Sequence, residues 1–439
     1  MKSLVFHVEP GGSLQGRARV PGDKSISHRS IMLGALADGV TEIEGFLEGA
    51  DALGTLYAFR AMGVWIDGPS DGRVVIHGVG LDGLAPPDGP LDLGNSGTSM
   101  RLLAGLLAAQ SFDTTLTGDE SLSGRPMRRV TEPLGRMGAL IETGEAGTPP
   151  LVIRGGRALQ GIEYESPVAS AQVKSAILLA GLYASDWTCV AEPSESRDHT
   201  ERMLAGFGWP VTRTGLTSCV EGGARLRARA IDVPADISSA AFFLVGATIA
   251  PDSDLVLEHV GWNPTRTGVV EILRLMGADI EVLAEREAGG EPVADLRVRS
   301  APLHGIDIPE ALVARAIDEF PVLFVAAACA RGRTRLTGAG ELRVKESDRI
   351  QVMADGLAVL GIDAQPTDDG IVIEGGPIGG GRVDSHGDHR IAMSFAVAGL
   401  RAASAIRIDD CRNVNTSFPG FADLARGLGL DLHEVSGDD

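Results

Sequence analysis

Basic residues that could bind phosphate or carboxylate groups recur along this chain, together with a few acids. They lie beside the expected starts of apolar helices or in loops between elements: Lys24, Arg29, Arg125, Arg197, Lys345, Arg349 and Arg390. A guanidinium group can donate two parallel hydrogen bonds to a phosphate or carboxylate group, and a lysine supplies a compact positive charge. Asp318 and Glu346 accompany these cations and could transfer protons. The mixture predicts a transferase that acts on small anionic molecules.

The short sequences that open the apolar helices also favour anions. They are "GDKSISHR", "GNSGTSMR", "SPVASAQVK", "PADISSA", "AIDEFP" and "HGDHR", and each offers Ser, Thr, Asp, Asn or Gly near a cap position. A helix start leaves N–H groups unpaired and carries about half a positive charge. If several starts face one cleft, that cleft binds anions although the chain has a net charge of −20.

Each motif taken alone has a simpler interpretation. "GNSGTSMR" is also typical of a turn with a helix cap, "ELRVKESDRI" of an exposed helix with alternating charges, and "DHR" of a cap with a surface ion pair. Their joint placement at helix starts favours the anion site. The nucleotide-binding motif GxxxxGK[ST] does not occur in the sequence, so nucleotide hydrolysis is not indicated.

A unit of about 70 to 80 residues recurs six times, and it must position these motifs. Each copy opens with an apolar helix of small residues, then a polar turn and a β-rich run; the copies begin at His28, Ser99, Gln172, Ser238, Glu319 and His389. An amphipathic second helix follows and should end on a left-handed glycine: Gly63, Gly138, Gly208, Gly277, Gly361 or Gly429. The first helix of each unit is therefore predicted to be buried and the second to lie outside.

The composition predicts a globular protein of two domains. At 439 residues the chain exceeds what one core usually supports, so the six units should divide three and three, with a changeover near Pro234. No apolar run reaches the roughly 20 residues of a membrane helix, and the first residues lack a secretory signal, so a cytoplasmic location is expected. The net negative charge and 4% aromatic content argue against nucleic-acid binding.

The four cysteines are scattered and form no CxxC pair. They are Cys189, Cys219, Cys329 and Cys411. This spacing suggests neither a disulfide framework nor a zinc site. We therefore expect four reduced thiols in the core.

Eight motifs, in chain order, resemble those of the 5-enolpyruvylshikimate-3-phosphate synthase family. They are "PGDKSISHR", "GNSGTSMR", "GRPM", "SAQVKSAILLAGL", "RDHTE", "IDEFP", "LRVKESDR" and "DHRIAMSF", and "SAQVKSAILLAG" and "RDHTE" are closer to the family's second class. The resemblance implies an α/β (α+β) fold, a two-domain inside-out α/β barrel of six βαβαββ repeats. The implied domains are 1–21 with 236–439, and 22–235, with a hinge that closes when substrate binds.

The resemblance also implies site residues. Shikimate 3-phosphate would be held by Lys24, Ser25, Arg29, Ser170, Ala171 through its backbone, Gln172, Arg197, Asp318 and Lys345. Phosphoenolpyruvate would be held by Lys24, Asn95, Gly97, Arg125, Gln172, Arg349 and Arg390. The implied catalytic residues are Asp318 as proton acceptor, Glu346, Lys24 and Lys345. The reaction would move the enolpyruvyl group to the 5-hydroxyl by addition and elimination, through a tetrahedral ketal, in chorismate and aromatic amino acid biosynthesis.

The family further implies a monomer that needs no metal or organic cofactor and that is a glyphosate target. Two positions depart from the first-class pattern: Thr416 stands where that class has a lysine, and Leu102 where it has a proline. One alternative is UDP-N-acetylglucosamine enolpyruvyl transferase, but "LTGDESLSGRPM" lacks the loop cysteine of that enzyme. Another is a non-catalytic anion-binding repeat protein, which would not need acids among its cations.

Overall fold

The computed structural model describes residues 4–436, and these residues form two compact units. Unit 1 comprises the described residues up to Pro21, then Pro234–Glu287, and the described residues from Pro292 onward; unit 2 comprises Gly22–Val233 and Ala288–Glu291. Along the chain, the boundary between the units falls at 233/234 rather than at the expected 235/236, and residues 288–291 belong to unit 2. The two expected domains, as separate folding bodies, stay a prediction.

Within residues 4–436 there are six sheets, which match the six predicted repeats. In unit 2 their spatial orders are β14 (Ala230–Asp232), β3 (Asp38–Glu44), β5 (Arg73–Val79), β4 (Trp65–Ser70); β6 (Leu91–Asp92), β7 (Thr114–Thr117), β9 (Leu151–Arg154), β8 (Leu140–Glu142); and β10 (Glu163–Glu165), β11 (Trp187–Ala191), β13 (Thr217–Glu221), β12 (Val211–Thr214). In unit 1 they are β16 (Asp279–Ala288), β17 (Glu291–Arg299), β15 (Asp254–Gly261), β2 (Gln15–Ala18); β18 (Arg333–Leu336), β20 (Gly370–Glu374), β19 (Asp363–Thr367); and β21 (Gly381–Asp384), β22 (Ile406–Asp409), β1 (Leu4–Val8), β23 (Leu432–Ser436). The mixed α/β class and the three-and-three division are confirmed.

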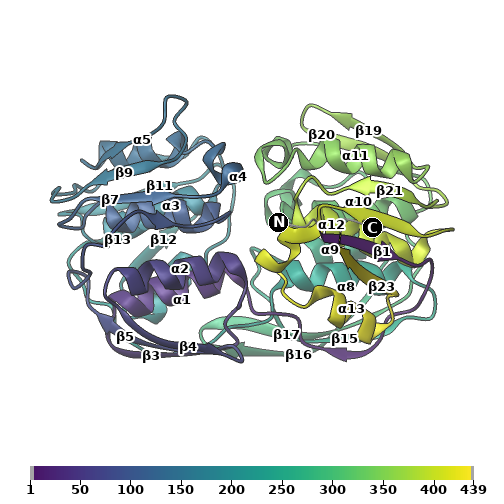
Figure 1. The fold of residues 1–439 in the computed structure, drawn as a ribbon, viewed down its shortest axis with the longest axis horizontal. Coiled ribbons are helices and arrows are strands. Elements are labelled where there is room, and N and C mark those ends of the chain that lie inside the picture. Colours follow the sequence, from purple (N-terminus) through teal and green to yellow (C-terminus); the bar gives the residue numbers. More distant parts are fainter. Residues whose placement is uncertain (1–3, 437–439) are drawn as a thin grey trace. The chain divides into compact units, whose positions relative to one another are not determined.

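The first helix of each repeat is buried, as its apolar sequence predicts. These helices are α1 (Lys24–Leu36), α3 (Gly97–Leu107) and α6 (Ala171–Gly181) in unit 2, and α8 (Ile237–Ile249), α10 (Phe320–Cys329) and α12 (His389–Ala398) in unit 1. Every residue of α8 is buried, because a helix that is apolar all round has no face for water. In Figure 1, β3, β4 and β5 run along the outer edge of unit 2, and α1 lies inward of them.

The second helices each carry a polar face. They are α2 (Ala50–Ala61), α5 (Arg128–Arg136), α7 (His199–Gly206), α9 (Gly268–Leu275), α11 (Arg349–Val359) and α13 (Phe421–Leu428), and a short α4 (Glu120–Ser123) precedes α5. The predicted left-handed glycines are confirmed at all six ends, with φ between 83° and 116°: Gly63, Gly138, Gly208, Gly277, Gly361 and Gly429. A side chain there would strain the backbone.

The first strands of the chain complete repeats that are distant in sequence. β1 lies between β22 and β23 of the sixth repeat, and β2 pairs in parallel with β15 of the fourth. In unit 2, β14 returns to pair in parallel with β3 of the first repeat. These pairings explain why unit 1 contains both the beginning and the second half of the chain.

The expectation of four reduced thiols is wrong for one pair. Cys189 on β11 faces Cys219 on β13 in the antiparallel register, with Cα atoms 4.1 Å apart, and the two form a disulfide. Thirty residues separate them in sequence, so spacing alone did not reveal the pairing. Cys329 and Cys411 are free.

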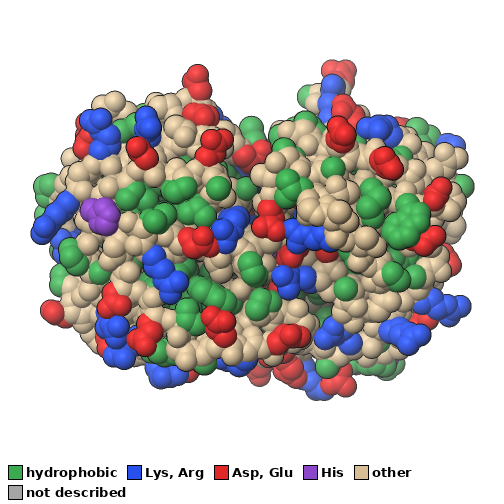
Figure 2. All heavy atoms as spheres, turned by 180° about the vertical axis from the view of Figure 1, so that it is seen from behind, with side chains coloured by type: hydrophobic (Ala, Val, Ile, Leu, Met, Phe, Trp, Pro, Cys, Tyr) green, Lys and Arg blue, Asp and Glu red, His purple; other side chains and the backbone are tan. Residues whose placement is uncertain are grey.

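The length of the described helices and the distribution of surface charge were also compared with what a membrane protein or a protein with one strongly charged face would show. No helix within residues 4–436 has both the length and the hydropathy to cross a membrane. Figure 2 shows acidic and basic side chains interspersed over the face that it draws.

Candidate functional site

The start of α1 in unit 2 presents Lys24 beside a buried carboxylate. Asp23 caps this helix by accepting a hydrogen bond from Ile26 N (2.9 Å). Lys24 Nζ lies 2.5 Å from Oδ2 of Asp51, which is in the first turn of α2. Asp51 therefore orients the half-buried ammonium group of Lys24. Sequence analysis missed Asp51, because an acid in the first turn of a helix is a common feature.

Arg29 is more deeply buried than its predicted ligand role requires. Its Nε donates to Thr200 Oγ1 (2.7 Å), and its Nη2 donates to Ser175 Oγ (2.8 Å). Its Nη1 donates to the carbonyl of Ser25 (2.9 Å). Burial, together with the charge of Arg197, outweighs the nearby carboxylates and lowers the pKa of Arg29 to about 10. Arg29 thus joins α1 to α6 and α7, and its contact with substrate stays a prediction.

The start of α3 brings three predicted residues together. Arg125 Nη2 donates to Asn95 Oδ1 (2.6 Å), and Asn95 Nδ2 donates to Asp119 Oδ2 (2.8 Å). A methyl group added at Gly97 would lie 3.2 Å from Nη1 of Arg125 and 2.9 Å from Nη1 of Arg101. Two guanidinium groups therefore lie beside Gly97, an arrangement suited to an anion.

Arg101 connects this group to the start of α6, and sequence analysis missed it. Its Nη1 donates to Gln172 Oε1 (2.6 Å), and Gln172 Nε2 donates to Thr98 Oγ1 (2.9 Å). The predicted residue Gln172 therefore joins Asn95, Gly97 and Arg125 through Arg101. The motif "GNSGTSMR" contained the signal, since its arginine lies one turn after the first residue of the helix.

A buried ion triad fixes the start of α6. Lys174 Nζ lies 2.7 Å from Glu192 Oε2 and 2.9 Å from Glu201 Oε1, and each of these three side chains is at most 6% exposed. Burial lowers the pKa of Lys174, but the two carboxylates outweigh that effect and the pKa is raised. Glu192 also accepts from the backbone N–H of Ser170 (3.1 Å). The triad thereby positions Ser170 and Ala171.

In unit 1 three carboxylates surround Arg349. Its Nε donates to Asp388 Oδ2 (2.8 Å), and its Nη2 donates to Glu346 Oε2 (2.6 Å). Asp318 Oδ1 lies 3.4 Å from Arg349 Nη1 and 3.4 Å from Lys345 Nζ. Asp318, Lys345 and Glu346 are half-buried, whereas the side chain of Arg349 is 1% exposed. The structure thus brings together four predicted residues, and the three that are predicted to act in catalysis are more accessible than Arg349.

Asp388 holds this cluster to the start of α12, and it is another residue that sequence analysis missed. It caps the helix by accepting from the backbone N–H of Arg390 (2.9 Å). Burial raises the pKa of Asp388, but the charge of Arg349 outweighs it and the pKa is lowered. The Arg390 side chain has no hydrogen-bond partner among the residues that the structure describes, and it is half-buried, so its donors are available to a ligand.

The two departures from the family pattern have local explanations. Thr416 Oγ1 donates to the carbonyl of Asn413 (2.7 Å), so its hydroxyl stabilises the 3₁₀ helix Cys411–Thr416 and supplies no positive charge. Leu102 is fully buried in the apolar core of unit 2. The proline-to-leucine difference therefore lies in the core, one position from Arg101.

A buried histidine on α1 links this helix to α2 and α3. His28 Nδ1 lies 2.8 Å from Thr55 Oγ1 and 3.3 Å from Ser99 Oγ. Its Nε2 has no hydrogen-bond partner among the described residues. Burial, and then the charges of Lys24 and Arg29, hold the pKa of His28 well below its usual value. The imidazole is neutral in the folded protein.

This lowered pKa predicts acid sensitivity. Below about pH 6.5 the unfolded chain binds a proton at His28 that the folded chain does not, so stability falls as pH falls. Between pH 6.5 and 5.5 we expect His28 to account for a loss of about 1 kcal/mol. Urea unfolding at both pH values measures it. The pH-dependent loss should shrink in His28→Gln and persist in His433→Gln, whose histidine is exposed; equal losses in wild type and His28→Gln would contradict the assignment.

Within residues 4–436 no cluster of three or more His, Cys, Asp or Glu side chains is arranged to hold a metal ion. The groups described above are cations, carboxylates, amides and helix starts. Such groups bind and orient an anionic substrate and move protons.

Comparisons with known proteins agree on one family. A family model described as EPSP synthase (3-phosphoshikimate 1-carboxyvinyltransferase) matches residues 8–424. A 3-phosphoshikimate 1-carboxyvinyltransferase from Alkalilimnicola ehrlichii is 73% identical over 98% of this chain and 96% of its own. One from Methylococcus capsulatus is 70% identical over 99% of both chains. The 2.37 Å structure of EPSP synthase from Acinetobacter baumannii has a TM-score of 0.89 and 58% identity, covering 98% of this chain and 100% of the other.

Proposed function

We propose that this chain, which belongs to the EPSP synthase (3-phosphoshikimate 1-carboxyvinyltransferase) family, transfers the enolpyruvyl group of phosphoenolpyruvate to the 5-hydroxyl of shikimate 3-phosphate and releases phosphate. The observation that carries this proposal is the family match over residues 8–424, which includes every predicted site residue. The reaction belongs to chorismate and aromatic amino acid biosynthesis. We expect a cytoplasmic monomer whose only partners are its two substrates.

The residues of unit 2 bind and orient in this proposal. The groups that hold shikimate 3-phosphate in this unit are Lys24, Ser25, Arg29, Ser170, Ala171 through its backbone, Gln172 and Arg197. Phosphoenolpyruvate meets Lys24, Asn95, Gly97, Arg125 and Gln172, and Arg101 adds a guanidinium beside Gly97. Cations that fork onto carboxylate and phosphate fix the approach of the two reactants.

The residues of unit 1 carry the proton transfers. Phosphoenolpyruvate gains a proton at C3 while the 5-hydroxyl oxygen attacks C2, and Asp318 takes the hydroxyl proton. The tetrahedral ketal then loses phosphate from C2 and a proton from C3, which leaves the enol ether. Glu346 or Lys24 handles the C3 proton, while Arg349, Arg390 and Lys345 stabilise the negative charges.

A phosphate-release assay with two acceptors tests the proposal. We expect phosphate release from phosphoenolpyruvate with shikimate 3-phosphate and none with UDP-N-acetylglucosamine. Release with the second acceptor alone would assign the chain to the other enolpyruvyl transferase. Binding of both anions without release would favour the non-catalytic repeat protein.

Gly97 should determine how well glyphosate competes with phosphoenolpyruvate. A methyl group in Gly97→Ala would meet Arg101 and Arg125 at 2.9 and 3.2 Å, so both guanidinium groups must shift. The longer inhibitor should tolerate this less than the compact substrate. We expect Gly97→Ala to weaken glyphosate more than phosphoenolpyruvate by about 1 to 3 kcal/mol. Inhibition and Michaelis constants measured side by side decide it, with Gly135→Ala as the control; equal losses for both ligands would remove Gly97 from the site.

A further inference from the structure

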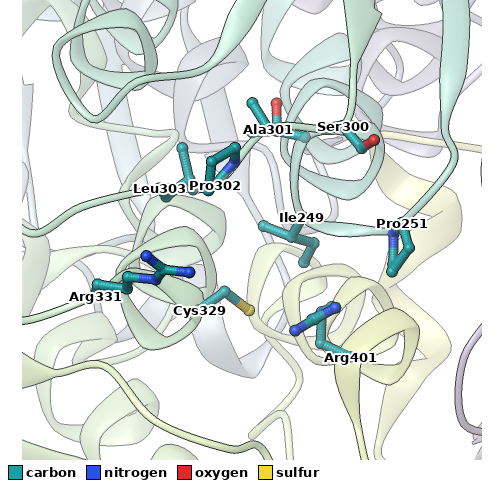
Figure 3. Close-up of a pocket in the computed structure, with 10 residues that line it drawn as sticks. Ile249, Pro251, Ser300, Ala301, Pro302, Leu303, Cys329, Arg331 and Arg401 are labelled. Atoms are coloured by element: carbon teal, nitrogen blue, oxygen red, sulfur yellow. The ribbon is translucent and has the colours of Figure 1, made fainter.

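A cavity of about 300 Å³ lies in unit 1 where three helices end. α8 ends at Ile249, α10 ends at Cys329, and the 3₁₀ turn Gly399–Arg401 follows α12. The loop after β17 forms another wall; the lining residues it supplies are Ser300, Ala301, Pro302 and Leu303. Figure 3 shows Arg331 and Arg401 on two sides of Cys329. The cavity combines apolar walls with two guanidinium groups.

The charged side chains that line this cavity are both positive. Its lining includes Arg331 and Arg401 and no aspartate or glutamate, in a chain with a net charge of −20. Burial raises the pKa of Cys329 to about 12, more than Arg401 lowers it, so this thiol is neutral at physiological pH. The helix ends beside the cavity each bring about half a negative charge, and the two full guanidinium charges outweigh them, so the site favours an anion.

The donors of both arginines are available. Across the part of the chain that the structure describes, neither the Arg331 nor the Arg401 side chain has a hydrogen bond or ion pair. Most other arginines of unit 1 are paired, as Arg297 is with Asp254 and Arg382 with Asp409. The hydroxyl of Ser300 also has no partner within residues 4–436. Two free guanidinium groups beside one cavity suit a carboxylate or phosphate group.

We propose that this cavity is a second ligand site, which binds a small organic anion. Its carboxylate or phosphate group lies between Arg331 and Arg401, and its apolar body packs against Ile249 and Leu303. A volume of about 300 Å³ is at the lower end for small-molecule sites, so the ligand is about the size of a single substituted ring.

The second site is separate from the predicted substrate residues of unit 1. Asp318 and Arg390 lie at the starts of α10 and α12, while the cavity lies at the ends of the same helices. Each of these helices has ten residues, which span roughly 15 Å at 1.5 Å per residue. An anion here would not overlap with substrate on Asp318 or Arg390, and binding at the two places can be measured separately.

Methyl NMR on the full chain tests the proposal, with labelled Ile249 and Leu303 as reporters. The probes are isophthalate, phenyl phosphate and uncharged isophthalamide, each added with saturating shikimate 3-phosphate and glyphosate to occupy the predicted substrate site. We expect at least one anionic probe to shift both methyl resonances saturably, and isophthalamide not to. A response to isophthalate alone identifies carboxylate as the preferred group, and a response to phenyl phosphate alone identifies phosphate.

Variants separate this site from general anion binding. Arg331→Gln/Arg401→Gln should raise the dissociation constant of the binding probe at least ten-fold, whereas Arg382→Gln, which removes an exposed paired arginine, should not change it. Both arginines of the cavity are exposed, so we expect the double variant to fold; the single variants replace it if its spectrum is not native. Absence of a saturable shift for either anion, equal binding of isophthalamide, or unchanged affinity in the arginine variants would overturn the proposal.

Discussion

Asp318→Ala should fold normally and lose about 10² to 10⁴ in turnover, the usual contribution of a general base. Asp318 is the half-buried carboxylate that contacts both Lys345 and Arg349, each at 3.4 Å. Arg349 keeps its shorter contacts with Asp388 and Glu346 when Asp318 is removed, so we expect the cluster to stay in place. In the proposed reaction no other group takes the proton of the attacking hydroxyl. Steady-state rates of phosphate release measure the loss.

A binding measurement distinguishes a base from a ligand-holding group. Shikimate 3-phosphate should bind Asp318→Ala and Asp318→Asn with only a few-fold loss of affinity. Asp307→Ala is the matched control, since its carboxylate is exposed and pairs with Arg335 in the same unit. Turnover within a few-fold of wild type, or a loss of affinity as large as the loss of turnover, would show that Asp318 is not the base.

The repeat structure was predictable because it rests on local signals. A helix that is apolar all round must be buried, and α8 is fully buried. A helix often ends on a residue in the left-handed conformation, which glycine adopts most easily, and Gly277 has such a positive φ. Pairings between distant segments carry no such signal. The insertion of β1 between β22 and β23 and the bond between Cys189 and Cys219 depend on register, which emerges only when the sheets assemble.

The candidate site was predictable to the extent that its residues stand in unusual sequence contexts. Lys24, Asn95 and Asp318 stand at helix starts, where a group of polar residues directly before an apolar run indicates a possible binding site. Their supporting partners do not: Asp51 looks like an ordinary first-turn acid, and Glu192 lies in a loop 22 residues after Ser170. Such residues gain their roles from burial and distance, which only the fold supplies.

Among the substitutions proposed in this article, Lys174→Met should destabilise the protein most, because it leaves two carboxylates buried without their cation. Breaking a buried ion pair from one side typically costs about 3 to 5 kcal/mol, and the Lys174 ammonium satisfies both Glu192 and Glu201. Because the pKa of Lys174 is raised, the stabilisation that Lys174 contributes is complete below about pH 10.5 and is lost only as pH rises through the higher folded value. The effect is therefore present at neutral pH.

The control is Arg154→Met. Arg154 also lies between two carboxylates, Asp113 and Glu142, but on the surface, where water replaces the lost contacts and the loss of stability should be small. Adding Glu192→Gln and Glu201→Gln to Lys174→Met should restore much of the stability, because neutral amides need no cation. Urea unfolding of the four proteins checks this, and equal losses in Lys174→Met and Arg154→Met, or no recovery in the triple variant, would show that unpaired buried charge is not the cause.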